Sequence, residues 1–157
     1  MGGEVRIELE AGHFSAVHFI AEHERCEHLH GHNWRVRVGV EGELDQRGMV
    51  VDFLELRARM GEILRKYDHR VLLPTLNPAV RVEEEGAGVR VRAGNRTFLF
   101  PAEDVVRLPV VNVTVEELAR LIGEELAGRL TGPNLRRLVI RVSEAPGQEA
   151  LFERALR

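Results

Sequence analysis

The sequence lacks a second cysteine, an excess of positive charge and any long apolar run, and each absence excludes a class of protein. Cys26 alone cannot form a disulfide within the chain, so a disulfide-stabilised fold is excluded. A net charge of −3 argues against a general binder of nucleic acid or of anionic membranes. No apolar stretch approaches the ~20 residues of a membrane-spanning helix. Residues 1–10 do not resemble a secretory signal, so we expect a cytoplasmic protein.

The remaining composition is that of a globular domain. Hydrophobic residues make up 44% of the chain and charged residues 30%, close to the usual proportions. A chain of 157 residues is a natural size for one domain with a substantial core. There is no repeat, linker or low-complexity segment, so we predict a single domain over residues 1–157.

Two strands are predicted in the first third of the chain. Apolar residues of one parity in segment 5–9 give way, after Gly12, to apolar residues of the other parity at Phe14 and Ala16. Such a switch predicts a β-bulge, and it places His18 on the face of Phe14 and Ala16.

The second predicted strand begins with two histidines. His30 and His32 extend an apolar face that continues through Trp34, Val36, Val38 and Val40. Because alternate residues of a strand share a face, both imidazoles are within reach of one point.

Two helices are predicted from capping boxes followed by apolar stripes. Asp52 with Glu55 starts the first helix, which ends around residues 67–70. Its stripe comprises Phe53, Leu56, Met60, Ile63, Leu64 and Tyr67. Thr114 with Glu117 starts the second, whose stripe comprises Leu118, Leu121, Ile122, Leu126 and Leu130.

The segment between the helices predicts an inserted hairpin over residues 78–111. Short strands within Val80–Phe100 are separated by glycine turns, and a further short strand is expected near residues 105–111. The last predicted strand, Arg137–Glu144, places Glu144 on its apolar face. This order predicts an α+β fold: an antiparallel sheet with two helices on one face and a small β insertion between the helices.

The histidines predict a zinc site. Catalytic zinc usually has three protein ligands at ~2.0–2.2 Å and one open position. His30 and His32 supply two ligands from one strand, and His18 is the natural third. Surface or core histidines are the competing interpretation, but five of the seven histidines lie within fifteen positions around the sole cysteine. His23 and His28 are further candidate ligands.

Cys26 has three possible roles. It could be the fourth ligand of a closed structural zinc site, a base or nucleophile beside the metal, or an inert small hydrophobe. Spacing does not separate the first two roles, while the charged neighbours Arg25 and Glu27 argue against the third.

Three further positions have simple structural interpretations. Asp68 is a turn former after the first helix, and His69 there favours the helix dipole. Glu144 could be a charged residue at a strand end, although an apolar face is an unusual place for an unpaired carboxylate.

Taken together, the motifs resemble those of the 6-pyruvoyl-tetrahydropterin synthase family. In chain order they are FSAVH (14–18), CEHLHGHNW (26–34), VDF (51–53), YDHR (67–70), NVTVEELA (112–119) and VSE (142–144). They cover nearly the whole chain apart from residues 78–111. The C-x-x-x-H-G-H spacing resembles the bacterial branch, the 6-carboxy-5,6,7,8-tetrahydropterin synthases of queuosine biosynthesis.

The resemblance implies zinc as cofactor and a role for each matching position. His18, His30 and His32 match the zinc ligands, and Cys26 matches the catalytic base. The family has the tunnelling fold, or T-fold, and assembles as trimers stacked into hexamers with active sites at subunit interfaces. We therefore expect a homo-oligomer.

Four more positions match residues that act on the substrate. Asp68 and His69 match the pair that completes a proton-transfer triad with the cysteine of a neighbouring subunit. Glu144 matches the carboxylate that anchors the pterin ring, and Thr114 matches a secondary pterin contact.

The implied reaction converts 7,8-dihydroneopterin triphosphate to 6-carboxy-5,6,7,8-tetrahydropterin with loss of triphosphate and acetaldehyde. The alternatives on the same fold are formation of 6-pyruvoyl-tetrahydropterin and cleavage to a hydroxymethylpterin for folate. Members that catalyse the cleavage tend to have glutamate in place of Cys26. A rival of another class is a non-catalytic zinc-binding assembly protein, which would not need Cys26, Asp68, His69 or Glu144. The segment between His69 and Thr114 is longer than is usual in the family.

Overall fold

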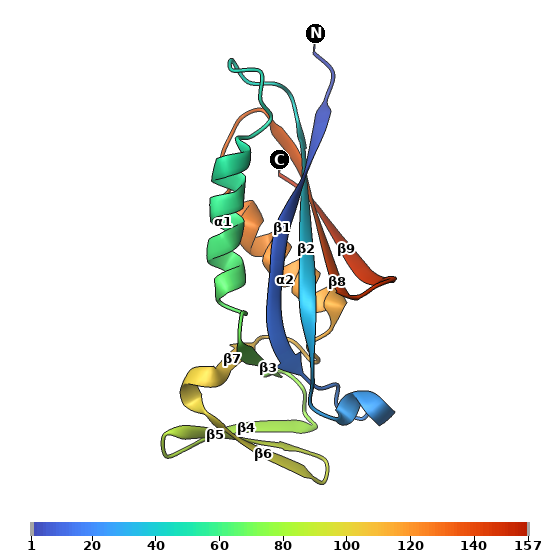
Figure 1. Cartoon of the computed structure of the whole chain (residues 1–157), viewed down its shortest axis with the longest axis vertical. Coiled ribbons are helices and arrows are strands. Elements are labelled where there is room, and N and C mark those ends of the chain that lie inside the picture. The colour runs from blue at the N-terminus through green and yellow to red at the C-terminus, as the bar shows by residue number, and fades with distance from the viewer. Residues whose placement is uncertain (1, 157) are drawn as a thin grey trace.

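The computed structural model describes residues 2–156, and Figure 1 shows its two layers and its inserted sheet. The main sheet has six strands in the order β7-β3-β1-β2-β8-β9. Their bounds are β1 Val5–His18, β2 His30–Gly42, β3 Arg70–Pro74, β7 Val105–Leu108, β8 Leu135–Ala145 and β9 Gln148–Ala155. Two helices, α1 (Phe53–Arg65) and α2 (Val115–Arg129), pack against it. The predicted α+β class is confirmed. No helix within residues 2–156 is long and apolar enough to cross a membrane.

The long hairpin of β1 and β2 contains the predicted bulge. Its antiparallel register shifts between Glu10 and Gly12, and Gly12 has a φ of 111°, a conformation that favours glycine. After the shift, Phe14, Ala16 and His18 all point into the core and are buried. The bulge therefore decides which face of the sheet carries His18.

The sheet differs from the prediction in being mixed rather than wholly antiparallel. The short strand β3 pairs in parallel with β1, and β7 pairs in parallel with β3. Residues 71–73 of β3 are all buried, so the strand is a short apolar run without the alternation that identifies a strand in a sequence. The edge strand β9 was also not predicted, because most of its side chains are exposed and its pattern is weak.

Both helices begin at their predicted caps. Asp52 Oδ1 accepts a hydrogen bond from the Leu54 amide at 2.8 Å, and Thr114 Oγ1 accepts one from the Glu117 amide at 3.2 Å. One continuous core joins both helices to one face of the sheet, and its largest fully buried members are Trp34, Phe14, Leu56, Met60, Ile63, Leu72, Leu118, Ile122, Leu126 and Leu138. Phe53 differs from the prediction: it lies in the first turn of α1 and is 48% exposed.

The insertion between the helices forms a separate three-stranded sheet of β4 (Val80–Glu85), β5 (Gly88–Ala93) and β6 (Arg96–Pro101). It lies at the end of the long strands where β1 finishes (Figure 1). A second core joins it to Phe19, Val71 and Leu73. The predicted glycine-turn strands are therefore present, although β7, within residues 78–111, joins the main sheet. A single domain over residues 1–157 stays a prediction.

Candidate active site

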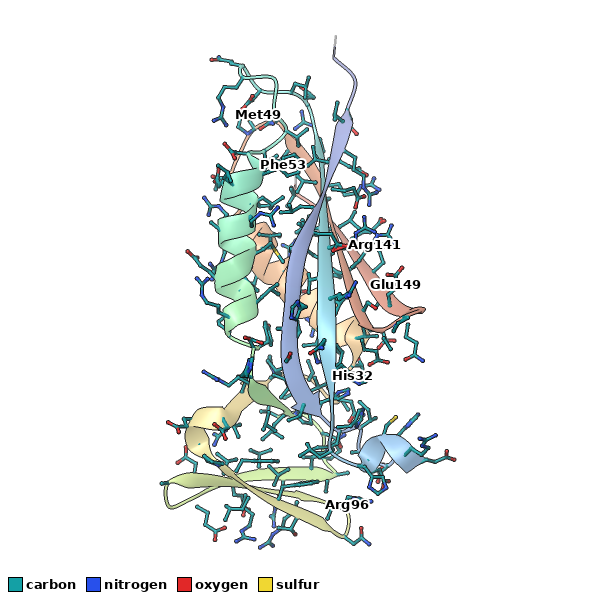
Figure 2. The ribbon with its side chains drawn as sticks, viewed as in Figure 1. His32, Met49, Phe53, Arg96, Arg141 and Glu149 are labelled. Atoms are coloured by element: carbon teal, nitrogen blue, oxygen red, sulfur yellow. The ribbon has the colours of Figure 1, made fainter. Side chains whose placement is uncertain are left out.

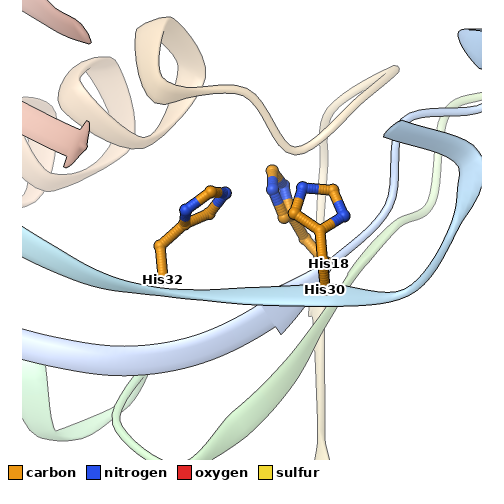
Figure 3. A group of neighbouring side chains, drawn as sticks. All are labelled: His18, His30 and His32. Carbon is orange, nitrogen blue, oxygen red and sulfur yellow. The ribbon is translucent and has the colours of Figure 1, made fainter. Parts of the chain in front are cut away.

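Three histidines meet where β1 ends and β2 begins (Figure 3). His18 lies directly opposite His30 in the antiparallel register, and His32 follows on the same face. One ring nitrogen from each histidine lies within 4.8 Å of the corresponding nitrogens of the other two. The ring centroids of His18 and His30 are 4.5 Å apart, and the edge of the group packs on Trp34. The predicted ligands are therefore brought together as a group that could hold a metal ion.

Backbone carbonyls fix the tautomers of two of these rings. His18 Nδ1 lies 2.7 Å from the Val113 carbonyl oxygen, and His30 Nδ1 lies 2.6 Å from that of His28. Because a carbonyl only accepts, each Nδ1 carries the proton and each Nε2 presents a lone pair. His18 Nε2 is buried and has no hydrogen-bond partner among the described residues. Its lone pair is therefore available to bind a metal ion held by the three histidines.

Burial disfavours the charged form of two of these histidines, His18 and His32. It lowers the pKa of His18 to about 4, and the nearby His30 and His32 act in the same direction. Burial also lowers the pKa of His32, against the raising effect of Glu144. A metal ion binds imidazole only in its neutral form, so the lowered pKa values of His18 and His32 favour metal binding.

A cavity of about 650 Å³ opens over the histidines, and Cys26 lines it. Cys26 lies in the short helix η1 (Glu24–Glu27) and is partly exposed. Its amide donates to the His23 carbonyl at 2.9 Å, and its carbonyl accepts from the Ile20 amide at 2.7 Å. These bonds fold the loop back over the end of β1. Cys26 is not one of the three grouped ligands.

Glu144 of β8 and Thr114, the N-cap of α2, line the same cavity. The register between β8 and β9 shifts between Ser143 and Ala145, so Glu144 occupies a β-bulge, a feature that re-aims a side chain. Its Oε2 atom lies 3.9 Å from His32 Nε2. The carboxylate of Glu144 thus lies beside the histidines, on the face that the strand pattern predicted for it. Thr114 lines the cavity and also caps α2.

Asp68 and His69 lie elsewhere. Asp68 Oδ1 accepts from the Ser15 amide at 2.9 Å, and its other oxygen lies 3.0 Å from His69 Nδ1. The bond from Ser15 lowers the pKa of Asp68, and His69 acts in the same direction. His69 lines a different cavity of about 500 Å³, together with Arg70 and Ser15. Its φ is 57°, in the left-handed region. Within one chain, six predicted site residues line the histidine cavity and this pair does not.

Comparison with known proteins decides the family. A family model for 6-pyruvoyl tetrahydropterin synthase matches residues 6–155. The chain belongs to this family. A relative from Pyrococcus horikoshii, provisionally named a 6-carboxy-5,6,7,8-tetrahydropterin synthase, is 34% identical over 135 residues, which cover 85% of this chain and 80% of the relative. The 6-carboxy-5,6,7,8-tetrahydropterin synthase of Haemophilus influenzae is 29% identical over 119 residues, which cover 72% and 76%.

A solved structure supports the same conclusion. The 6-pyruvoyl tetrahydropterin synthase of Plasmodium vivax superposes with a TM-score of 0.91 at 26% identity, covering 98% of this chain and 99% of that one. As a member of the 6-pyruvoyl tetrahydropterin synthase family, the chain has the T-fold and is a pterin-processing enzyme. Both the resemblance and the fold predicted from the motifs are confirmed.

Some residues at the histidine cavity were not predicted as site residues from the sequence. Arg25 lines the histidine cavity, and among the arginines of residues 2–156 it alone does so. Gln148 lines it too, but could not be predicted without β9. The Val113 carbonyl is a backbone group with no side-chain signal. His23 lines the cavity outside the ligand group, and His28 bonds elsewhere.

Proposed function

We propose that the protein converts 7,8-dihydroneopterin triphosphate and water to 6-carboxy-5,6,7,8-tetrahydropterin, triphosphate and acetaldehyde, with zinc as its cofactor. This reaction would place it in queuosine biosynthesis. The observation that carries the proposal is the cavity that Cys26 and Glu144 line together with the three grouped histidines. Its volume of about 650 Å³ is within the usual range of small-molecule sites.

The three histidines suit zinc. Two ligands at ~2.0–2.1 Å from a tetrahedral ion lie about 3.4 Å apart, and the histidine nitrogens lie within 4.8 Å of one another, so small ring rotations would bring them to bonding distance. His18, His30 and His32 would hold the ion. When bound, it would acidify the substrate's side-chain hydroxyls and stabilise negative charge on their oxygens.

The other residues have separate tasks in the proposal. Cys26, as thiolate, takes the proton from the side-chain carbon of the substrate. Glu144 accepts hydrogen bonds from the N–H edge of the pterin, and Thr114 makes a secondary contact with the ring. Arg25 is our candidate for binding the triphosphate, since guanidinium pairs with phosphate oxygens.

Asp68 and His69 need a second subunit in this proposal. Neither residue lines the cavity of Cys26 in one chain, and His69 lines a different one. In the proposal they would therefore complete the proton-transfer triad across an interface between copies. We therefore propose a homo-oligomer, a trimer or hexamer with shared active sites, acting in the cytoplasm. The short Asp68–His69 contact of 3.0 Å would orient the imidazole for proton transfer.

The test of the reaction is product analysis. The zinc-loaded protein is incubated with 7,8-dihydroneopterin triphosphate, and the pterin and the small carbonyl product are identified by mass. The 6-carboxy product with acetaldehyde supports the proposal. A 6-pyruvoyl or hydroxymethyl product would move the protein to another activity of the same site, and no turnover would refute all three.

Cys26→Ala separates an enzyme from a zinc-binding scaffold. As a general base, Cys26 should contribute roughly 10²–10⁴-fold to the rate, so activity should fall by that factor while the zinc content stays the same. Loss of zinc in this variant would make Cys26 a ligand instead and would favour the structural role.

A further inference from the structure

The inserted sheet packs directly beneath the candidate active site. Phe98 of β6 stacks on Phe19, with ring centroids 5.4 Å apart and an interplanar angle of 19°. Phe19 directly follows His18 and is 1% exposed, so the contact fixes the insertion to the end of β1. The insertion is thus a packed part of the molecule rather than a free flap.

A tight turn aims one arginine of this sheet at the loop of Cys26. Ala93 and Arg96 pair across a two-residue turn, and Gly94 has a φ of 61°, as the first central position of a type II′ hairpin requires. Figure 2 shows Arg96 at this end of the inserted sheet, beside η1. Arg96 is therefore the first residue after a tight turn of the inserted sheet.

Arg96 contacts two consecutive residues of the loop. Its Nη2 atom lies 3.3 Å from His28 Nε2, and because guanidinium only donates, His28 accepts through Nε2. Its Nε atom lies 3.8 Å from Glu27 Oε2, and this buried nitrogen has no hydrogen-bond partner among the described residues. Glu27 directly follows Cys26 and belongs to the same short helix.

The chain of contacts continues to the histidines. The His28 carbonyl accepts from His30 Nδ1 at 2.6 Å. One side chain of the insertion is therefore connected on one side to the residue next to Cys26 and on the other, through His28, to a candidate metal ligand.

We propose that Arg96 is a positioning residue: it holds the loop so that the Cys26 thiol stays over the histidine group. The inference rests on the proposed function, and it assigns the insertion a task in the site. A partly exposed ion pair contributes little to stability, so loss of Arg96 should leave the fold intact. A displaced reacting group, in contrast, costs rate directly.

The experiment compares Arg96→Ala and Arg96→Lys with Arg81→Ala, a control on the same inserted sheet. The Arg81 side chain is 72% exposed, and its ion pair is with Glu83 of the same strand, β4. Three quantities are measured: kcat and KM, zinc content, and the rate at which iodoacetamide alkylates Cys26, the only thiol of the chain. We expect Arg96→Ala to lower kcat about tenfold with KM within about twofold, and to raise the alkylation rate severalfold. Zinc content should stay the same, and Arg96→Lys should be intermediate.

If kcat and alkylation in Arg96→Ala match those of Arg81→Ala, the proposal is wrong. If Arg96→Ala does not fold, the test uses Arg96→Lys and Glu27→Gln instead. An alkylation rate of Cys26 in both variants equal to that of the unaltered protein would overturn the proposal. The alkylation rate does not depend on turnover. Absence of turnover in the unaltered protein would therefore refute the proposed function, while alkylation would still decide the role of Arg96.

Discussion

His18 and His30 face each other across β1 and β2, directly paired in the antiparallel register with ring centroids 4.5 Å apart. Directly opposed residues of an antiparallel pair point to the same face. The bulge at Glu10 and Gly12 determines that this is the face of the buried core. The candidate metal group is thus a consequence of strand register.

The first prediction concerns zinc binding. His18→Ala should reduce zinc affinity by at least about a hundredfold, because a three-ligand site loses a ligand. His13→Ala is the matched control, an exposed histidine on the same strand. Metal content after dialysis and competition with a chelator measure both. Equal zinc retention in the two variants would contradict the assignment.

The second prediction concerns pH and the metal-free protein. Burial lowers the pKa of His18 from 6.5 to about 4 in the folded state. Between pH 6.5 and pH 4, the imidazole of His18 binds a proton in the unfolded chain but not in the folded chain. The contribution of His18 to the free energy of unfolding is therefore fully present above pH 6.5 and decreases as the pH falls toward 4. The loss from this group should approach about 3 kcal/mol.

Urea unfolding with a chelator present, from pH 7 to pH 4, measures this effect. His18→Asn should show a shallower fall in the free energy of unfolding than the unaltered chain. Identical pH dependence in both proteins would show that His18 does not carry it.

The third prediction concerns the bulge. Gly12 has a φ of 111°, so Gly12→Ala should destabilise the protein by about 1–3 kcal/mol. Gly128→Ala is the control: it lies in α2 with no atom within 4 Å of an added Cβ, and should stabilise by about 0.5–1 kcal/mol. Urea unfolding midpoints measure both changes. If both variants change the free energy of unfolding in the same direction, the backbone strain expected for Gly12→Ala is refuted.

The fourth prediction concerns the triphosphate. Arg25→Ala should raise KM for the triphosphate substrate about tenfold with a smaller change in kcat, because a lost ground-state contact weakens binding. Arg47→Ala, in the exposed loop after β2, is the control. An unchanged KM in Arg25→Ala would assign phosphate binding to another residue.

The fifth prediction concerns shared sites. Cys26→Ala and His69→Ala should each lose most of the activity alone. Co-expressed in equal amounts, they should recover about a quarter of the unaltered activity, because random pairing of subunits restores one complete site in four. No recovery in mixed oligomers would show that Cys26 and His69 do not act across an interface.

Much of the fold could be predicted because its signals are local. The parity switch around Gly12 predicts the bulge, and Asp52 and Thr114 predict the starts of the two helices, since each depends on a few neighbouring residues. Strand β3 and strand β9 could not be predicted. The first has no alternation because its residues after Arg70 are all buried, and the second is an exposed edge with a weak pattern.

The candidate site divides in the same way. By itself, the sequence determined that His30 and His32 share a face, that Glu144 extends an apolar strand, and that the motifs match one family. Only the tertiary structure decided which atoms meet: the Val113 carbonyl on His18, Arg96 against the Cys26 loop, and the separation of His69 from Cys26. The physical reason is that strand parity repeats over two residues, whereas these contacts join segments that only chain packing brings together.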